Sequence, residues 1–252
     1  LDLSKKPATA LTEDEQRFLV TWFFLANWDH MIKPHPRYHD LLMKRGATPR
    51  DTTWSETAKR FKPQDYLDLQ TWFNLVWIDP WLRQQDPHLA ALEAKGGRFT
   101  EADKQLVLAK QLELIAQILP TYQQAQTQGQ VELTTSPYYH PIVPLLCDIR
   151  SAHAALPQLP LPSISFRHPE DARSQLHQAM RRHEELFGNP PAGLWPPEGS
   201  VSEALIALAL EAGLRWMATD EAILWQTLKT SRATSLLYRP HAVRRNNRSL
   251  AM

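Results

Sequence analysis

The run GLWPPEGSVSE, residues 193–203, forces a change of backbone direction in the second half of this chain. Pro196 and Pro197 lack the backbone N–H and restrict φ, so a strand that enters this run is predicted to end at Trp195. Glu198 follows the two prolines directly. It is therefore predicted to lie on a turn rather than within a strand.

A helix is predicted to begin just after this turn. Gly199 permits a tight turn, and Ser200 or Ser202 can cap a helix whose apolar residues recur at helical spacing. The segment thus joins a strand to a helix and holds Glu198 where a carboxylate can do chemistry. A simpler explanation stays open, because a glutamate near a helix N-terminus can serve only the helix macrodipole or the solvation of a turn.

Two other segments show the same order of an apolar strand followed by a polar residue. They are residues 131–141, which end near His140, and residues 214–221, which contain Asp220. The C-terminal ends of parallel strands share one edge, where active sites are assembled from distant parts of a sequence. We therefore expect His140, Glu198 and Asp220 to meet. Two local alternatives remain: His140 hydrogen-bonds within a proline-bounded loop, and Asp220 only caps the next helix.

The first of these strands, residues 131–136, carries a charged residue. Side chains alternate along a strand, so one face holds Val131, Leu133 and Thr135 and the other holds Glu132, Thr134 and Ser136. A carboxylate directed into a barrel interior is costly unless it is paired or hydrogen-bonded. Glu132 is therefore either a functional group or a strand-start residue that stays in solvent.

The first half of the chain is predicted to be helical. Apolar periodicity indicates long helices over residues 11–32, 63–82 and 101–129, with start signals at Thr12, Pro63 and Thr100 and a stop at Gly129. We expect an α/β protein in which residues 1–128 form a helical region and residues 129–252 form a partial (β/α) barrel.

The second half contains further expected elements. The proline-rich residues 156–173 are predicted to be a surface connection into a helix over residues 169–187, and residues 236–243 are predicted to be a strand. No closing helix follows that strand, and the sequence begins without methionine. We expect the chain to be truncated at both ends.

Composition excludes several classes of protein. A chain of 252 residues supports one sizeable core, and a net charge of +1 argues against a nucleic-acid partner. The single cysteine, Cys147, cannot form an intrachain disulfide and is predicted to be a buried structural thiol. There is no apolar run of about 18 residues and no signal peptide, so we expect no membrane partner and a cytoplasmic location.

No metal or cofactor is expected. The chain has no CxxC or HExxH zinc signature. His35 and His39 have a spacing that suits two ligands on one helix face, but Pro36 and the lack of an acidic third ligand favour a polar loop that enters a helix.

Two stretches, GQVELTTSPYYHPIVPLLCD and GLWPPEGSVSEALIALALEAGLRWMATDEAIL, resemble the catalytic region of glycoside hydrolase family 57, the amylopullulanase and α-amylase-like enzymes. The resemblance implies an incomplete (β/α)7 barrel and a retaining mechanism with Glu198 as the nucleophile. It further implies sugar binding by Glu132, His140 and Trp195, with Asp220 orienting a neighbouring group. The family's early His-Gln-Pro motif and the later motif that carries the acid/base aspartate have no match here.

The expected function is therefore hydrolysis of an α-glucan such as starch, glycogen or maltodextrin by double displacement. A 4-α-glucanotransferase or a branching enzyme would use the same residues. A non-catalytic carbohydrate-binding fragment is the alternative from another class, because the acid motif is absent. The oligomeric state cannot be read from the sequence.

Overall fold

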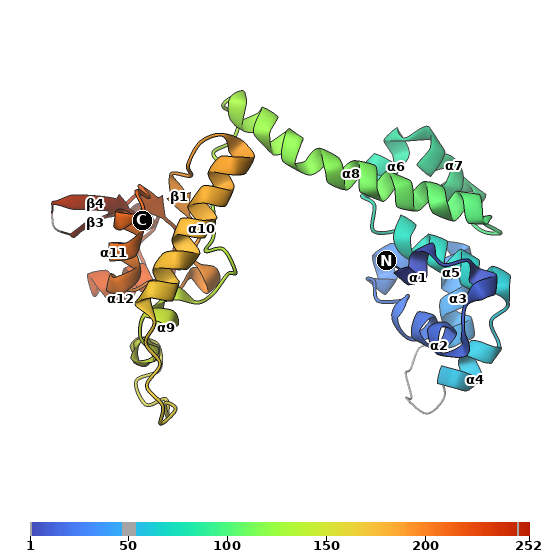
Figure 1. Ribbon diagram of the computed structural model, residues 1–252, viewed down its shortest axis with the longest axis horizontal. Coiled ribbons are helices and arrows are strands. Elements are labelled where there is room, and N and C mark those ends of the chain that lie inside the picture. Colours follow the sequence, from blue (N-terminus) through green and yellow to red (C-terminus); the bar gives the residue numbers. More distant parts are fainter. Residues whose placement is uncertain (1, 47–53, 246) are drawn as a thin grey trace. The chain divides into compact units, whose positions relative to one another are not determined.

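The computed structural model describes residues 2–46, 54–245 and 247–252 (Figure 1). The chain divides into two compact units, Leu1–Ile118 and Leu119–Met252. The boundary between them falls inside the long helix α8 (Glu101–Thr127), whereas the expected boundary at residue 128 lies just past the end of this helix. No helix in the described part of the chain is long and apolar enough to cross a membrane.

The first unit is helical. Its elements are α1 (Asp2–Lys5), η1 (Ala8–Ala10), α2 (Glu13–Trp22), the π-turn η2 (Trp28–Ile32), α3 (Pro36–Arg45), α4 (Trp54–Lys59), α5 (Pro63–Leu75), α6 (Pro80–Gln85), α7 (Pro87–Lys95) and the first part of α8. They pack around a core in which Trp72 and Tyr38 are the largest fully buried side chains. The predicted helical character of this half is confirmed.

Two of the three predicted helices are interrupted. The predicted helix over residues 11–32 ends at Trp22, and Asn27 caps a separate turn by accepting from the N–H groups of Asp29 and His30. The predicted helix over residues 63–82 ends at Leu75. Asp79 and Pro80 start a new helix there, because proline disfavours a helical conformation at the residue before it and fits the first turn of the next helix.

The third helix follows its predicted ends. Thr100 and Asp103 exchange backbone and side-chain hydrogen bonds at the start of α8. At its end Gly129 adopts φ 68°, and the N–H of Gln130 bonds back to the Ala125 carbonyl, which is a glycine-dependent helix stop. The capping box of Thr12 with Glu15 is likewise confirmed at the start of α2.

The second unit combines helices with a small mixed sheet. Its elements are α9 (Val143–Cys147), η4 (Ile149–Ala154), α10 (Pro169–Phe187), β1 (Gly193–Leu194), the turn η5 (Pro197–Gly199), α11 (Glu203–Glu211), β2 (Trp216–Met217), α12 (Glu221–Leu228), α13 (Thr234–Leu237), β3 (Ala242–Arg245) and β4 (Arg248–Ala251). The sheet order is β1-β2-β4-β3, with β1, β2 and β4 parallel and β3 antiparallel to β4. The chain is therefore a helix-rich α/β protein.

Two predicted strands differ from the structure. Residues 131–136 form only an isolated parallel bridge, which joins Thr135 to Leu194 of β1. Residues 236–243 were predicted as one strand, but Leu236 and Leu237 belong to α13 and the strand begins at Ala242. Pro240 lies between the two and cannot donate to a sheet ladder, which explains the late start.

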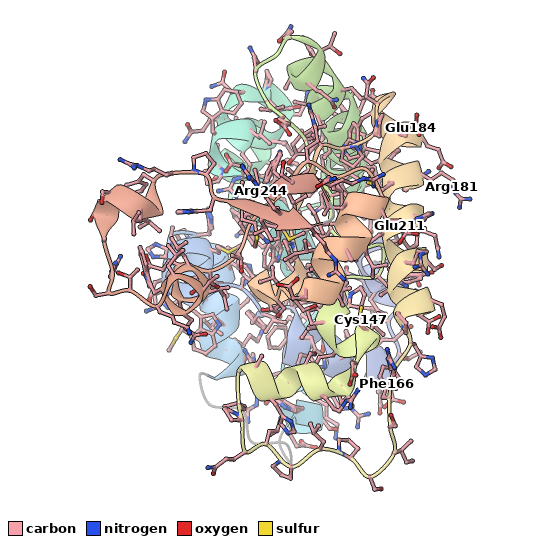
Figure 2. The ribbon with its side chains drawn as sticks, turned by 90° about the vertical axis from the view of Figure 1, so that its left-hand side faces the viewer. Cys147, Phe166, Arg181, Glu184, Glu211 and Arg244 are labelled. Carbon is pink, nitrogen blue, oxygen red and sulfur yellow. The ribbon has the colours of Figure 1, made fainter. Side chains whose placement is uncertain are left out.

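One face of the sheet is covered by helices. Leu194, Met217 and Leu250 are buried there, together with side chains of α9, α10 and α11. Cys147 belongs to the same core, so its prediction as a buried thiol is confirmed, and burial raises its pKa. Figure 2 shows Cys147 on α9 and Glu184 on the outer side of α10.

The helix α11, which follows the Glu198 turn, is capped by one of the two serines that the sequence offers. Ser202 is the N-cap of α11, and its hydroxyl accepts from the Leu205 N–H at 3.2 Å. Ser202→Ala should lower the free energy of unfolding of the second unit by about 1 kcal/mol. Urea unfolding measures this change. Ser200→Ala is the matched control, because no described residue hydrogen-bonds to the Ser200 hydroxyl, and an equal loss in both variants would contradict the assignment.

Candidate functional site

Three neighbouring chain segments run parallel and end at one edge of the sheet. Thr135 donates its N–H to the Gly193 carbonyl at 3.2 Å and accepts from the Trp195 N–H at 2.8 Å, while β1 pairs with β2 on its other side. At the C-terminal edge the Ser136 hydroxyl donates to the Trp195 carbonyl at 3.0 Å. The loops that follow these segments therefore start from a common edge.

The Glu198 turn is also tied to the loop that carries Asp220. The Thr219 hydroxyl donates to the Gly199 carbonyl at 2.7 Å. A side-chain carbon on Gly199 would lie 3.5 Å from the Asp220 backbone nitrogen, so these two loops are packed together. The structure thus brings the loops of Glu198 and Asp220 into contact.

Glu198 has a backbone conformation that is uncommon for its residue type. Its φ is 56° and its ψ is 20°, in the left-handed region, and Gly199 follows with φ 64°. The turn is closed by N–H donation from Gly199 to Pro196 at 3.0 Å and from Ser200 to Pro197 at 3.0 Å. Non-glycine residues held in this region concentrate at functional sites.

The Glu198 side chain is available for chemistry. It is exposed, and within the described ranges no side chain or backbone group hydrogen-bonds to its carboxylate. It does not cap the next helix, because Ser202 does so and Glu203 is the acidic residue in the first turn of α11. Helix capping therefore does not account for Glu198, whereas its exposure also fits the simpler explanation that the carboxylate solvates the turn.

His140 lies on the first of the three loops and is exposed. It also has a left-handed backbone, with φ 57°. Its loop is held to α10 by the N–H groups of Tyr138 and Tyr139, which donate to the main-chain and side-chain oxygens of Gln175 at 3.2 and 2.7 Å. No partner for the imidazole occurs among the residues that the structure describes, so a local hydrogen bond of the ring does not explain this residue.

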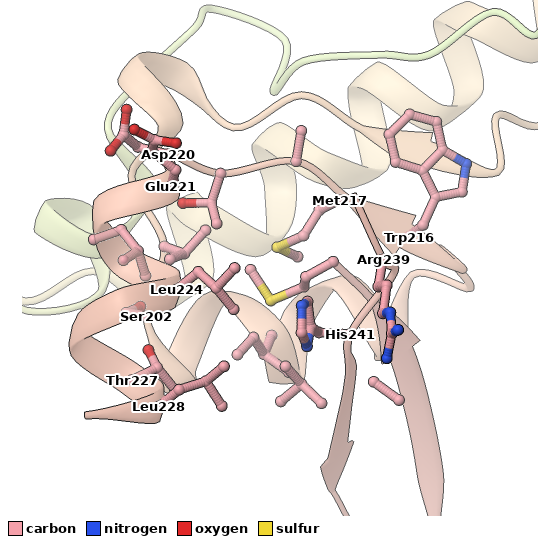
Figure 3. A pocket seen from close by; sticks show the side chains of 18 of the residues that line it. Ser202, Trp216, Met217, Asp220, Glu221, Leu224, Thr227, Leu228, Arg239 and His241 are labelled. Carbon is pink, nitrogen blue, oxygen red and sulfur yellow. The ribbon is translucent and has the colours of Figure 1, made fainter. Parts of the chain in front are cut away.

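Asp220 caps the helix that follows it, which was the alternative role expected for this residue. Its Oδ1 accepts from the Ala222 N–H at 2.7 Å and caps α12. Asp220 also borders a cavity of about 680 Å³ between α11, α12, α13 and the sheet. Figure 3 shows Asp220 and Glu221 at one end of this cavity, with Arg239 and His241 across from them.

This cavity is distinct from the surroundings of Glu198. Its walls are mainly apolar side chains of α12 and the sheet, such as Leu224 and Met217, and neither Glu198, His140 nor Trp195 lines it. The described structure therefore places Asp220 at the border of two regions, the C-terminal edge of the sheet and the cavity beneath α12.

Trp195 and Glu132 lie on the face of the sheet that the helices do not cover. Trp195 is 57 % exposed. Glu132 is exposed as well, and its Oε1 accepts from the indole Nε1 of Trp216 at 2.8 Å. Trp216 was not singled out from the sequence, because its position next to Glu132 depends on the register of β1 with β2.

Of the two histidines considered as metal ligands, His35 is packed inside the first unit. His35 is 8 % exposed, stacks on Trp72 with 4.4 Å between ring centroids, and has its Nδ1 3.9 Å from Glu93 Oε1. Burial lowers the pKa of His35, which favours the neutral form of the ring. Among the described residues no group of three or more His, Cys, Asp or Glu side chains is placed to hold a metal ion.

The left-handed backbone at Glu198 should limit stability. Asparagine tolerates this conformation better than glutamate, so Glu198→Asn should raise the free energy of unfolding by about 0.5–1 kcal/mol. Glu184→Asn, at an exposed helical position of α10, is the matched control. It should lower the free energy of unfolding by a few tenths of a kcal/mol, roughly the difference in helix propensity between the two residues. Equal destabilisation of the two variants in urea would show that the turn differs in solution.

Comparison with known proteins identifies the family of the chain. The family model described as glycosyl hydrolase family 57 matches residues 11–252, which include most of the first unit, all of the second and every residue of the candidate site. No curated protein and no solved structure matches the chain. The chain belongs to glycosyl hydrolase family 57 and is an enzyme of the glycoside hydrolase type.

Proposed function

We propose that this protein is a retaining α-glucan hydrolase of the α-amylase or amylopullulanase type, with Glu198 as its nucleophile. The main support is the state of the Glu198 carboxylate. It is exposed, has no partner in the described part of the chain, and is carried on a backbone turn closed by two hydrogen bonds at the C-terminal edge of parallel strands. A nucleophile needs this combination of a free charge and a defined position.

The proposed framework is part of a (β/α)7 barrel formed by residues 129–252, with residues 1–128 as a helical region. Parallel pairing of Thr135, β1 and β2 in chain order supports it, as do the helices α10 and α11 that connect and cover these segments. The antiparallel pair of β3 and β4 is a departure from the repeating pattern of a barrel.

In the proposed reaction, a Glu198 oxygen attacks the anomeric carbon while the bond from that carbon to the leaving sugar oxygen breaks. A carboxylic acid gives its proton to the departing oxygen, and later takes a proton from the water that displaces Glu198. The family resemblance assigns this acid to an aspartate in a motif without a match in this chain. We assign no proton transfer to Asp220, because it is engaged at the N-terminus of α12.

Trp195 and His140 are proposed to bind the sugar. The exposed indole of Trp195 precedes the Glu198 turn by three residues, and aromatic rings suit the apolar face of a pyranose. His140 is exposed on the neighbouring loop and can donate or accept through its ring nitrogens.

Glu198→Gln keeps the shape of the side chain and removes its nucleophilic charge. Release of fluoride from α-maltosyl fluoride, whose leaving group needs no proton from the unmatched acid motif, should fall by about a thousandfold or more, or about 4 kcal/mol in activation free energy, with an unchanged melting temperature. Glu184→Gln on the outer side of α10 is the matched control and should retain full activity (Figure 2). Near-normal turnover by Glu198→Gln would exclude it as the nucleophile.

A second experiment identifies the chemical role directly. Glu198→Ala should be rescued by azide with an α-maltosyl fluoride substrate, because azide occupies the space of the missing carboxylate and yields a β-glycosyl azide. Formation of that product, detected by NMR, supports double displacement. If the wild-type chain binds maltooligosaccharides but releases no fluoride from α-maltosyl fluoride, the carbohydrate-binding alternative replaces the hydrolase proposal.

A further inference from the structure

Trp216 of β2 lies across the neighbouring strand β1. Gly193 and Trp216 are paired in the parallel register. A side-chain carbon built on Gly193 would lie 2.3 Å from both Cε2 and Cζ2 of the Trp216 indole, closer than any real contact. The ring therefore occupies the space that a side chain at residue 193 would need, and only glycine permits this arrangement.

The far end of the same ring is held by Glu132. The indole Nε1 donates to Glu132 Oε1 at 2.8 Å, a hydrogen bond between residues 84 positions apart. Glu132 lies on the segment that borders β1 on the side opposite β2. The indole thus spans β1 from one neighbour to the other, and a charge-assisted hydrogen bond together with the contact on Gly193 fixes its orientation.

This ring is half-buried and is directed away from the helix-covered core. Side chains alternate between faces, and Met217 and Leu194 point into the helix-covered core with 1 % and 0 % exposure. Figure 3 shows Trp216 and Met217 directed to opposite sides of β2. Trp195 is two residues beyond Gly193 and therefore shares the face of the Trp216 ring, about 6–7 Å further along the strand.

We propose that Trp216 is a second sugar-stacking residue beside Trp195, and that Glu132 is a positioning residue that acts through Trp216 rather than on the sugar. This inference rests on the proposed α-glucan substrate. The two indoles form a strip that leads along β1 toward the Glu198 turn, and each can pack on the apolar face of one glucose unit. An indole that is fixed before binding loses little conformational entropy when the sugar arrives.

Isothermal titration calorimetry with maltoheptaose tests the proposal on the full chain. Trp216→Ala and Glu132→Leu should each raise Kd about tenfold, equivalent to about 1.4 kcal/mol. Glu132→Gln should bind like the wild type, because its amide oxygen still accepts from the indole. Trp22→Ala, which removes an exposed indole from α2 outside the sheet, is the matched control and should leave Kd unchanged.

The double variant separates positioning from direct contact. If Glu132 acts through Trp216, then Glu132→Leu combined with Trp216→Ala should bind no more weakly than Trp216→Ala alone. Full additivity would show that Glu132 contacts the sugar itself and would overturn the positioning role. If the wild type binds maltoheptaose and Trp216→Ala binds it equally well, the stacking role is overturned and the proposed function stands. If the wild type binds no glucan, both the stacking role and the proposed function are overturned.

A spectroscopic readout keeps the test valid if Trp216→Ala does not fold. The chain has nine tryptophans, and the milder Trp216→Phe variant identifies the indole N–H resonance of Trp216 by its disappearance. In the wild type this resonance should shift when maltoheptaose is added, and Glu132→Leu should displace it before any ligand is present. A resonance insensitive to maltoheptaose would contradict stacking at Trp216.

Discussion

The parallel pairing of β1 with Thr135 on one side and β2 on the other is the constraint on which the second unit depends. Few backbone hydrogen bonds are involved, yet they fix the register that lays Trp216 over Gly193 and brings Glu132 within 2.8 Å of its indole nitrogen. A shift of one residue would turn every side chain of β1 to the other face. Leu194, fully buried against the helices, makes such a shift costly.

Local chemistry made part of this structure predictable. Two consecutive prolines end β1 before Glu198, Ser202 caps α11, and α10 spans Pro169–Phe187 as predicted, because each of these features is decided by neighbours within a few residues. The interruption of the first long helix was missed for a related reason. Asn27 is compatible with the helical pattern of its neighbours, and only the structure shows that its side chain caps a new turn.

Features that depend on distant residues could not be predicted in the same way. The segment 131–136 alternates like a strand but pairs only through Thr135, because partner groups decide whether an extended segment becomes a ladder. The bond between Glu132 and Trp216 joins segments that are separated by the whole of α10 and α11. The sequence pattern predicts Glu132 either in a functional role or in solvent, and the structure shows it exposed but hydrogen-bonded.

Gly193 of β1 and Glu198 of the turn that follows this strand each depart from ordinary backbone preferences. Because Gly193 has no side chain, the neighbouring Trp216 indole can pack directly on it. Glu198 has an unfavourable left-handed backbone, and its carboxylate does not cap the helix that follows. Both features carry a conformational cost, since glycine weakens a strand and a left-handed glutamate is strained. The packed Trp216 indole accounts for the glycine, and the proposed role of Glu198 as a nucleophile accounts for the left-handed turn.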